Sequence, residues 1–176
     1  MHVPRQSGFT VVEIAIATSV LLILAGIGLP SFQEAIRGFR LTSALTAYSA
    51  DFAFARAGAI GQSRKVVACP SVDGRRCSLD GDWSRGWMVF VDANGDIAPD
   101  NAESVLQTHG PLPAGVAARS TAGRPFLRYL PDGTSAGSNL TLRLCQQDQM
   151  RASVVVNNAG RIRVDRLRVP TACPAA

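Results

Sequence analysis

The sequence has almost no lysine, and its positive charge is carried by arginine. Of the 18 basic residues only Lys65 is a lysine, and the other 17 are arginines. Arginine stays charged when partly buried and binds phosphate through two parallel N–H groups, which lysine cannot do. A genome rich in G and C also favours arginine over lysine. The placement of the arginines, and not their number, therefore carries any argument about function.

Constellations for catalysis and metal binding are also missing. The two histidines, His2 and His109, are not at metal-ligand spacing, and no two of the four cysteines form a CxxC motif. No combination of serine, histidine and acid suggests a hydrolase. We therefore expect no enzyme, no cofactor and no metal site.

One loop has the composition of a calcium site but the wrong order. It runs over residues 92–96, as Asp-Ala-Asn-Gly-Asp, with Asp100 and Glu103 beyond it. In an EF-hand loop the glycine is sixth, after three alternating oxygen ligands. Here Gly95 is fourth, and an Asn-Gly pair after a strand is better explained as a hairpin turn.

Charge is absent from a long apolar segment near the amino terminus. Residues 9–29 number 21, and Glu13 is the only charged one among them. About 20 apolar residues span a bilayer core as a helix, so this segment is predicted to be a transmembrane helix. Glu13 costs about 2–3 kcal/mol or more in lipid unless it meets a partner. No small-residue cleavage site follows Leu29, which favours an uncleaved anchor over a secretory signal.

The four cysteines follow this apolar segment. An even number of cysteines beyond a membrane helix suits an oxidising compartment. Four cysteines allow three sets of disulfide pairings. In the most economical set, which has the shortest loops, one bond closes a small loop and the second bond connects the carboxyl-terminal tail back to the domain. That pairing joins Cys69 to Cys77 and Cys145 to Cys173.

The apolar pattern continues beyond Pro30 as a helical stripe. Its members recur at three- and four-residue steps, which indicates an amphipathic helix over residues 30–60 that continues the anchor and is broken or bent near Pro30. Gly58 and Gly61 are expected to end it near Ala59. The stripe comprises Phe32, Ile36, Phe39, Leu41, Leu45, Tyr48, Phe52 and Ala55.

The remainder, residues 61–176, is rich in short β-branched and aromatic runs separated by turns. These runs predict a β-rich domain, and the turn at 157–160 predicts a hairpin. The expected strands are Lys65–Ala68, Trp87–Val91, Val105–Thr108, a further one within Leu112–Ala118, Phe126–Leu130, Leu140–Leu144, Ser153–Val156 and Ile162–Val164.

The amino terminus resembles a known processing site. Gly8-Phe9-Thr10-Val11-Val12-Glu13, after a short polar leader, is similar to that of the type IV pilin and type II secretion pseudopilin superfamily. The resemblance implies that residues 1–8 are a leader, that prepilin peptidase cuts after Gly8, and that Phe9 is then N-methylated. It also implies that Glu13 assists assembly by pairing with the terminal amine of a neighbouring subunit.

The carboxyl half of the sequence indicates which group within this superfamily the chain resembles. Its pattern, quoted below, resembles the GspH/FimT group, which contains minor pseudopilins of type II secretion and minor pilins, some of which bind DNA in natural transformation. The pattern comprises Trp87-x-x-Phe90-x-Asp92, Pro131-Asp132-Gly133, Leu142-x-Leu144-Cys145, Val154-Val155-Val156 and Gly160-Arg161-Ile162-Arg163.

The last 37 residues are strongly basic. They contain six arginines and two acids, a net charge of +4, while the whole chain carries +5 and would lose Arg5 on cleavage. Arg161 and Arg163 alternate along an expected strand and should share a face, and Arg166 and Arg168 repeat the spacing. A similar GRxR segment is linked to DNA binding in FimT proteins. Two alternatives explain these arginines without DNA: they form the solvent-exposed face of a strand, or they contact acidic residues of neighbouring subunits in a pilus.

This basic segment contains no aromatic residue for base stacking, so phosphate contacts without strong preference for single strands are expected. The sequence leaves open whether Arg119, Arg124 and Arg128 extend the patch.

Together these observations predict an α+β protein in which a long amino-terminal helix packs on an antiparallel, pilin-like domain. The expected protein is a single-pass minor pilin of the bacterial inner membrane, with its domain in the periplasm, that joins other pilins in a filament and binds DNA. The alternative is a minor pseudopilin of type II secretion with a structural role and no nucleic acid.

Overall fold

The computed structural model describes Gly8 and residues 10–173, apart from the side chain of Ile27. The chain divides into two compact units, residues 1–39 and 40–176. One helix, α1 (Val11–Gln62), contributes residues to both. The two units are described separately below.

The described part of the first unit is mostly helical. Thr10 caps α1: its hydroxyl oxygen accepts the Glu13 N–H at 3.3 Å, and a Glu13 carboxylate oxygen accepts the Thr10 N–H at 3.0 Å. The helix continues through Pro30 without a break. By length and composition it can span a membrane, as the apolar run predicted.

The second unit begins with the carboxyl half of α1. Leu45, Tyr48, Phe52 and Ala55 of the predicted stripe are buried, and Ala44, which was not counted in it, is buried with them. Leu41 is half-buried, and in the first unit Ile36 is half-buried while Phe32 and Phe39 are exposed. The helix ends at Gln62, about three residues beyond the expected end. Ser63 then adopts a left-handed conformation (φ 51°), and the Arg64 N–H returns to the Ala59 carbonyl at 3.2 Å.

Two antiparallel four-stranded sheets complete the second unit. The first sheet has the order β3-β2-β1-β5 and the second sheet the order β4-β6-β7-β8. The strands of the first are β1 (Val66–Pro70), β2 (Trp87–Val91), β3 (Val105–His109), which follows the short 3-10 helix η1 (Ala102–Ser104), and β5 (Leu127–Tyr129). Those of the second are β4 (Val116–Ser120), β6 (Leu140–Gln146), β7 (Gln149–Val156) and β8 (Ile162–Ala172).

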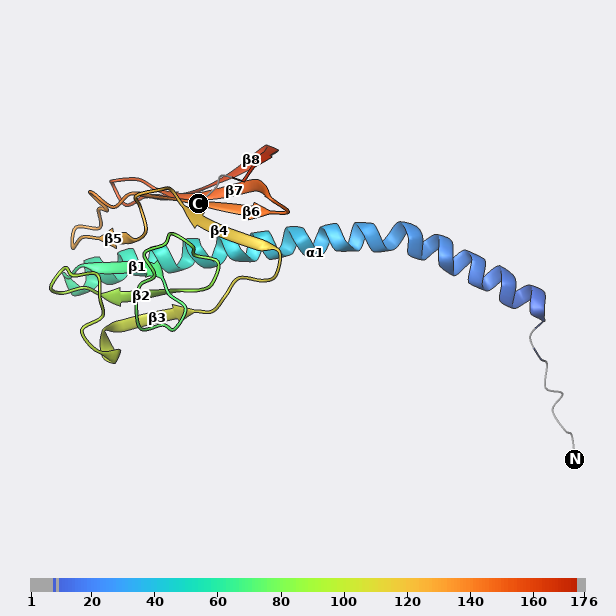
Figure 1. Ribbon diagram of the computed structural model, residues 1–176, viewed down its shortest axis with the longest axis horizontal. Helices are drawn as coiled ribbons and strands as arrows, with labels where there is room; N and C mark the ends of the chain where they lie inside the picture. The colour runs from blue at the N-terminus through green and yellow to red at the C-terminus, as the bar shows by residue number, and fades with distance from the viewer. Residues whose placement is uncertain (1–7, 9, 174–176) are drawn as a thin grey trace, which may run out of the picture. The chain divides into compact units, whose positions relative to one another are not determined.

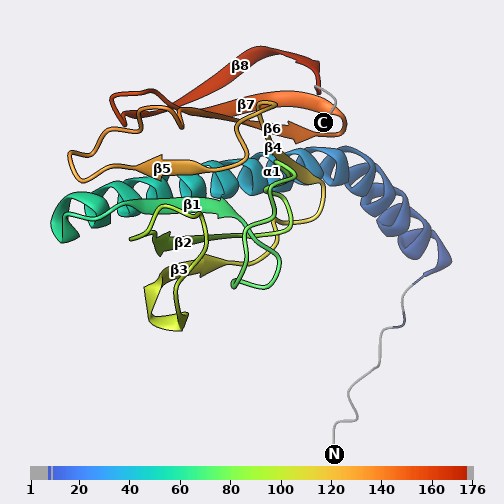
Figure 2. The same cartoon turned by 60° about the vertical axis from the view of Figure 1, so that its left-hand side comes forward.

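The helical segment 40–62 lies between the two sheets (Figure 1 and Figure 2). Aromatic rings fill the space beside it: Tyr48 packs on Trp87 with ring centroids 4.1 Å apart, and Phe52 meets Trp83 edge-on at 5.7 Å. Alternate residues of β6 and β7, among them Leu142 and Val154, enter the same core. One apolar core therefore holds the helix and both sheets together.

The outer faces of the two sheets differ. On the first sheet, Val67, Met88 and Phe90 form a second small core, against which Phe126 and Ile97 from neighbouring loops pack. On the second sheet, both views show no helix or strand over the face turned away from α1 (Figure 1 and Figure 2). The first sheet is covered on both faces, and the second on one.

Both disulfides of the economical pairing are formed. Cys69–Cys77 closes the loop after β1, and Cys145–Cys173 joins β6 to the residue after β8. The second bond therefore ties the end of the chain across β7.

Candidate nucleic-acid interface

The four arginines expected to contact DNA, Arg161, Arg163, Arg166 and Arg168, are all exposed. They lie on or just before β8, which is the edge strand of the second sheet. β8 pairs with β7 as the predicted hairpin, with Val154 opposite Val164 and Val156 opposite Ile162. The strand continues eight residues further than expected.

Arg163 lies on the outer face of the second sheet. Its neighbour Ile162 packs on the core, so the alternation of the strand turns Arg163 away from it. The side chain is 71% exposed, and its Nε donates to the Asp165 carboxylate at 2.9 Å. An exposed pair of this kind is weak, so Arg163 remains free to exchange Asp165 for a phosphate.

Arg166 lies on the opposite face from Arg163. Its guanidinium donates to the Thr42 hydroxyl of α1 at 3.2 Å. It also borders a hollow of about 730 Å³ with Val164 and helix residues that include Leu45 and Ser49. Arg166 therefore faces the helix, so the basic residues of β8 divide between two faces.

Arg168 lies where β8 departs from regular pairing. Arg166 is opposite Ala152, and Thr171 is opposite Met150. Four residues of β8 therefore lie between these two pairs, where β7 has only one, which makes a β-bulge. This bulge includes Pro170, which has no N–H to donate to a ladder. Arg168 is presented from the bulge and not from either regular face.

Arg161 follows a turn that is held from the helix. Arg56 of α1 donates through Nε to the Gly133 carbonyl at 2.9 Å and through a terminal nitrogen to the Ala159 carbonyl at 3.3 Å. Gly160 has φ +74°, and a Cβ there would overlap the Gly133 carbonyl oxygen. The glycine before Arg161 is thus required for packing, whatever the arginines bind.

Arg128 is committed to the fold. Its guanidinium donates to the Asp92 carboxylate at 2.9 Å and to the Gly95 carbonyl at 3.1 Å, and Asp92 is fully buried. The other oxygen of Asp92 accepts the Gly95 N–H at 2.9 Å. The loop considered above as a calcium site is therefore a turn closed by an arginine, and no cluster of metal-binding side chains occurs among the described residues.

A buried carboxylate that sequence reasoning did not single out joins α1 to the first sheet. Asp51 accepts hydrogen bonds from Trp87 Nε1 at 2.6 Å and Gln107 Nε2 at 2.8 Å. His109 Nδ1 lies 3.5 Å away, and the His109 ring stacks on Trp87 with centroids 4.2 Å apart. Asp51 precedes Phe52 in the sequence and lies outside the apolar stripe defined above, so this network was not predicted.

Tyr48, a member of the apolar stripe of the helix, is also a buried polar residue. Burial, with the nearby carboxylates of Asp82 and Asp51, raises the pKa of Tyr48 well above its ordinary value. The hydroxyl therefore stays protonated, and it donates to the Trp83 carbonyl at 2.9 Å.

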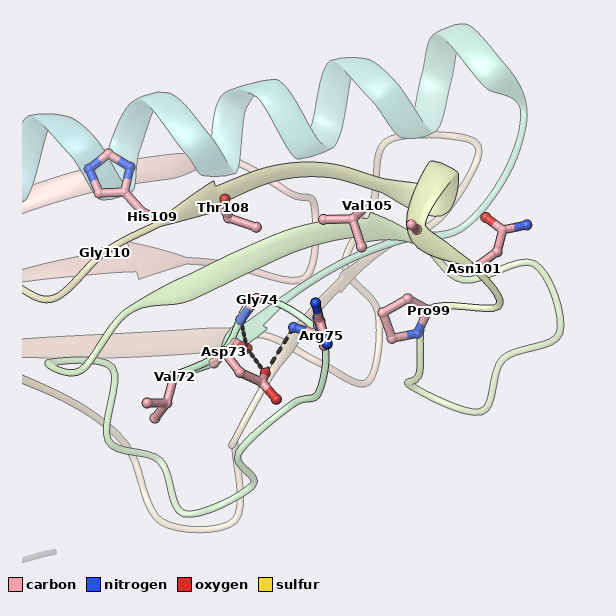
Figure 3. A pocket seen from close by; sticks show the side chains of 12 residues that line it. Val72, Asp73, Gly74, Arg75, Pro99, Asn101, Val105, Thr108, His109 and Gly110 are labelled. Carbon is pink, nitrogen blue, oxygen red and sulfur yellow. Dashed lines mark hydrogen bonds between the residues drawn. The ribbon is translucent and has the colours of Figure 1, made fainter.

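A hollow of about 710 Å³ opens between the loop after β1 and the edge strand β3 (Figure 3). Asp73 lies at its rim and accepts the N–H groups of Arg75 at 2.8 Å and Arg76 at 3.0 Å. These bonds lower the pKa of Asp73. The carboxylate is occupied in shaping its own loop.

The processing residues lie at the start of the first unit. Gly8 is exposed, and nothing lies within 4 Å of the position where a Cβ would be. Phe9 and the leader residues 1–7 lie outside the described residues. Glu13 lies in the first turn of α1, where its carboxylate also accepts the Thr10 hydroxyl at 3.0 Å.

The family model described as Type II transport protein GspH matches residues 44–160, more than half of the chain. The chain belongs to the GspH family. Members of this family are minor pilins or pseudopilins that assemble with other pilins, and they are structural proteins and not enzymes. An apolar amino-terminal helix in a GspH-family protein is consistent with a pilus component anchored in the inner membrane.

Two crystal structures of FimU, a type IV minor pilin of Pseudomonas aeruginosa, have the same fold. One is 24% identical with a TM-score of 0.61 and covers 78% of this chain and 98% of FimU. The other is 22% identical with a TM-score of 0.58 and covers 76% and 99%. The minor pseudopilin EpsH of Vibrio cholerae is 14% identical, with a TM-score of 0.49 and coverage of 71% and 95%. The search of curated proteins finds no match.

Proposed function

We propose that this GspH-family protein is a minor type IV pilin that binds DNA without sequence preference during uptake in natural transformation. The observation that carries the proposal is the charge of the second sheet and its connections. Residues 116–172, which also include β5 of the first sheet, contain nine arginines and three aspartates, a net charge of +6. Without Arg128, which pairs with Asp92, the net charge is +5. Such a surface attracts the phosphate backbone of DNA.

The arginines near the carboxyl terminus, in residues 140–176, which we call the basic tail, have different roles in this proposal. Arg161 and Arg163 contact phosphates from the turn and the outer face, and the bulge adds Arg168. Arg166, which faces α1, contributes through its charge and its position at the edge. Phosphate contacts of this kind fix the position of a protein on DNA and carry no sequence information.

The amino terminus has a separate part. Prepilin peptidase removes residues 1–8, Phe9 becomes the methylated amino terminus, and α1 holds the protein in the inner membrane with its domain in the periplasm. Glu13 then pairs with the amine of a neighbouring pilin, which offsets the cost of a carboxylate in an apolar setting.

The second candidate is a minor pseudopilin of type II secretion that contributes to a filament and binds no nucleic acid. It is favoured by the description of the matching family as a transport protein. DNA binding separates the two candidates, because a purely structural pseudopilin has no need of it.

The test is binding of a fluorescent duplex to the full chain in neutral detergent, measured by anisotropy at several salt concentrations. Replacing Arg161 and Arg163 by Gln should weaken binding about tenfold and lower the slope of log affinity against log salt by about 1–2, because each lost phosphate contact removes about 0.9 from it. Replacing Arg75 and Arg76 by Gln is the matched control, since it removes the same charge from the first-sheet side.

Two results would contradict the proposal. The first is that the wild-type protein does not bind duplex DNA even at low salt, which would favour the second candidate, a structural pseudopilin. The second is equal weakening by both pairs of substitutions, which would mean that only net charge matters.

A further inference from the structure

Two arginines stand directly opposite each other on the outer face of the second sheet. Arg119 of β4 pairs in register with Arg143 of β6. Ala118 and Leu144, which precede and follow them on the two strands, enter the core, so both arginines turn outward. Side chains in directly opposite positions have Cβ atoms about 5 Å apart, and like charges placed there repel each other.

The two carboxylates near this pair, Asp80 and Asp82, are both engaged by other groups. Among the described residues, no carboxylate forms an ion pair with Arg119 or Arg143. Asp80 lines the hollow described below, but Arg85 pairs with it, and its other oxygen accepts the Asp82 N–H at 3.0 Å. Asp82 stands opposite Arg119 in the chain pairing, and its carboxylate accepts the Ser84 N–H at 3.0 Å and lies 3.4 Å from Arg85 Nε. Both residues are half-buried, so solvent screens their charges less than it screens a fully exposed pair.

A third arginine completes a concave site. Arg124 follows a turn after β4 and is fixed by donation to the Gly137 carbonyl at 2.6 Å, which uses one of its five N–H groups. Arg119, Arg124 and Arg143 line one hollow of about 240 Å³. Gly123 at its rim has no neighbour within 4 Å of where a Cβ would be, so the mouth is open.

We propose that this hollow, the Arg119 pocket, binds a phosphodiester of the DNA backbone. A single negative charge between two opposed guanidinium groups would replace repulsion with two charge-assisted contacts, each of which can be bidentate. This inference rests on the proposed function and adds to it a site outside the basic tail.

One duplex can reach both sites. Successive strands lie about 4.8 Å apart, so the Arg119 pocket on β4 and Arg163 on β8 are separated by about 14 Å across the sheet. DNA carries one charge per about 1.7 Å of its axis, so several phosphates fall within that distance. Asp165 lies on this path, and its pairing with Arg163 reduces its repulsion of DNA.

The test is the anisotropy titration above with Arg119→Gln/Arg143→Gln in the full chain. We expect about tenfold weaker duplex binding and a salt slope lower by about 1–2. The matched control, Arg75→Gln/Arg76→Gln, should change affinity less than twofold. The melting temperature should stay the same or rise, because the substitution removes a repulsive pair.

The variant Arg119→Lys/Arg143→Lys keeps the charge but loses the bidentate geometry. It replaces the Gln variant in the titration if the Gln variant does not fold. It should bind more weakly than wild type with nearly the same salt slope. Unchanged duplex affinity in these variants, beside weakened binding by Arg161→Gln/Arg163→Gln, would overturn the Arg119 pocket alone. A wild-type protein that does not bind duplex would overturn the proposed function as well.

Discussion

The two sheets of this protein use charge in opposite ways. At the first sheet, the acids are buried and paired: Asp92 is paired with Arg128, and Asp51 of α1 receives hydrogen bonds from Trp87 and Gln107. In the second sheet, arginines lie on an outer face that none of the described helices and strands covers, and Arg119 and Arg143 oppose each other without an ion pair to either among the described residues. The charge of the first sheet stabilises the fold, and that of the second is available to a ligand.

The difference extends to net charge. Residues 66–110, which hold three of the four strands of the first sheet, contain seven acids and three arginines, a net charge of −4, against +6 for residues 116–172. Opposite fields on two parts of one domain orient an approaching polyanion toward one of them. The comparison teaches that the overall charge of +5 conceals a polarised molecule.

The largest effect should follow from breaking the network of the first sheet. Asp51→Ala leaves the buried Trp87 N–H without an acceptor and opens a small cavity, so we expect a loss of about 3–4 kcal/mol. Thermal unfolding of the full chain, followed by circular dichroism, measures it. Glu103→Ala removes an exposed acid and should change stability by less than about 0.5 kcal/mol. An unchanged melting temperature in Asp51→Ala would show that the carboxylate is not structural.

A smaller loss should follow at the turn that presents the basic tail. Gly160→Ala combines a left-handed backbone with an overlap on the Gly133 carbonyl, and should cost about 2–3 kcal/mol. Gly137→Ala is the control, because Gly137 also has a positive φ, of +80°, but has open space around it. It should cost about 1 kcal/mol. Equal losses in the two variants would mean that backbone conformation alone makes Gly160 necessary.

The smallest effect should be a pH-dependent one at Asp73. Because its pKa is lowered from an ordinary value of 3.8, its contribution to stability is fully present above that value and is lost as the pH falls through the lower pKa of the folded state. Asp73→Asn should therefore melt slightly below wild type at neutral pH, and the gap should close below about pH 4. A gap that persists in acid would assign the effect to the shape of the side chain and not to its charge.

Much of the fold follows from local pattern. The run of 21 residues with one acid predicted the apolar helix, and the turn at 157–160 predicted the β7–β8 hairpin. The two disulfides follow the pairing with the shortest loops. These features depend on neighbours in the sequence, which is why they could be predicted.

The candidate site could be predicted only in part. Alternation placed Arg163 on one face, but which face of β8 meets α1 depends on the order of strands, and so the inward position of Arg166 could not be foreseen. The contacts of Arg56 join residues 77 and 103 positions apart. The opposition of Arg119 and Arg143 likewise depends on the pairing of β4 with β6, which are separated in the chain by β5.

The irregular end of β8 has a consequence for how copies of this protein avoid one another. An edge strand offers unpaired N–H and C=O groups on which another chain can add a strand. In β8 the bulge, Pro170 and a row of arginines interrupt that template. Addition of strands from other copies at this edge would produce aggregates. The residues of β8 that we propose to contact DNA thus also keep the sheet from growing.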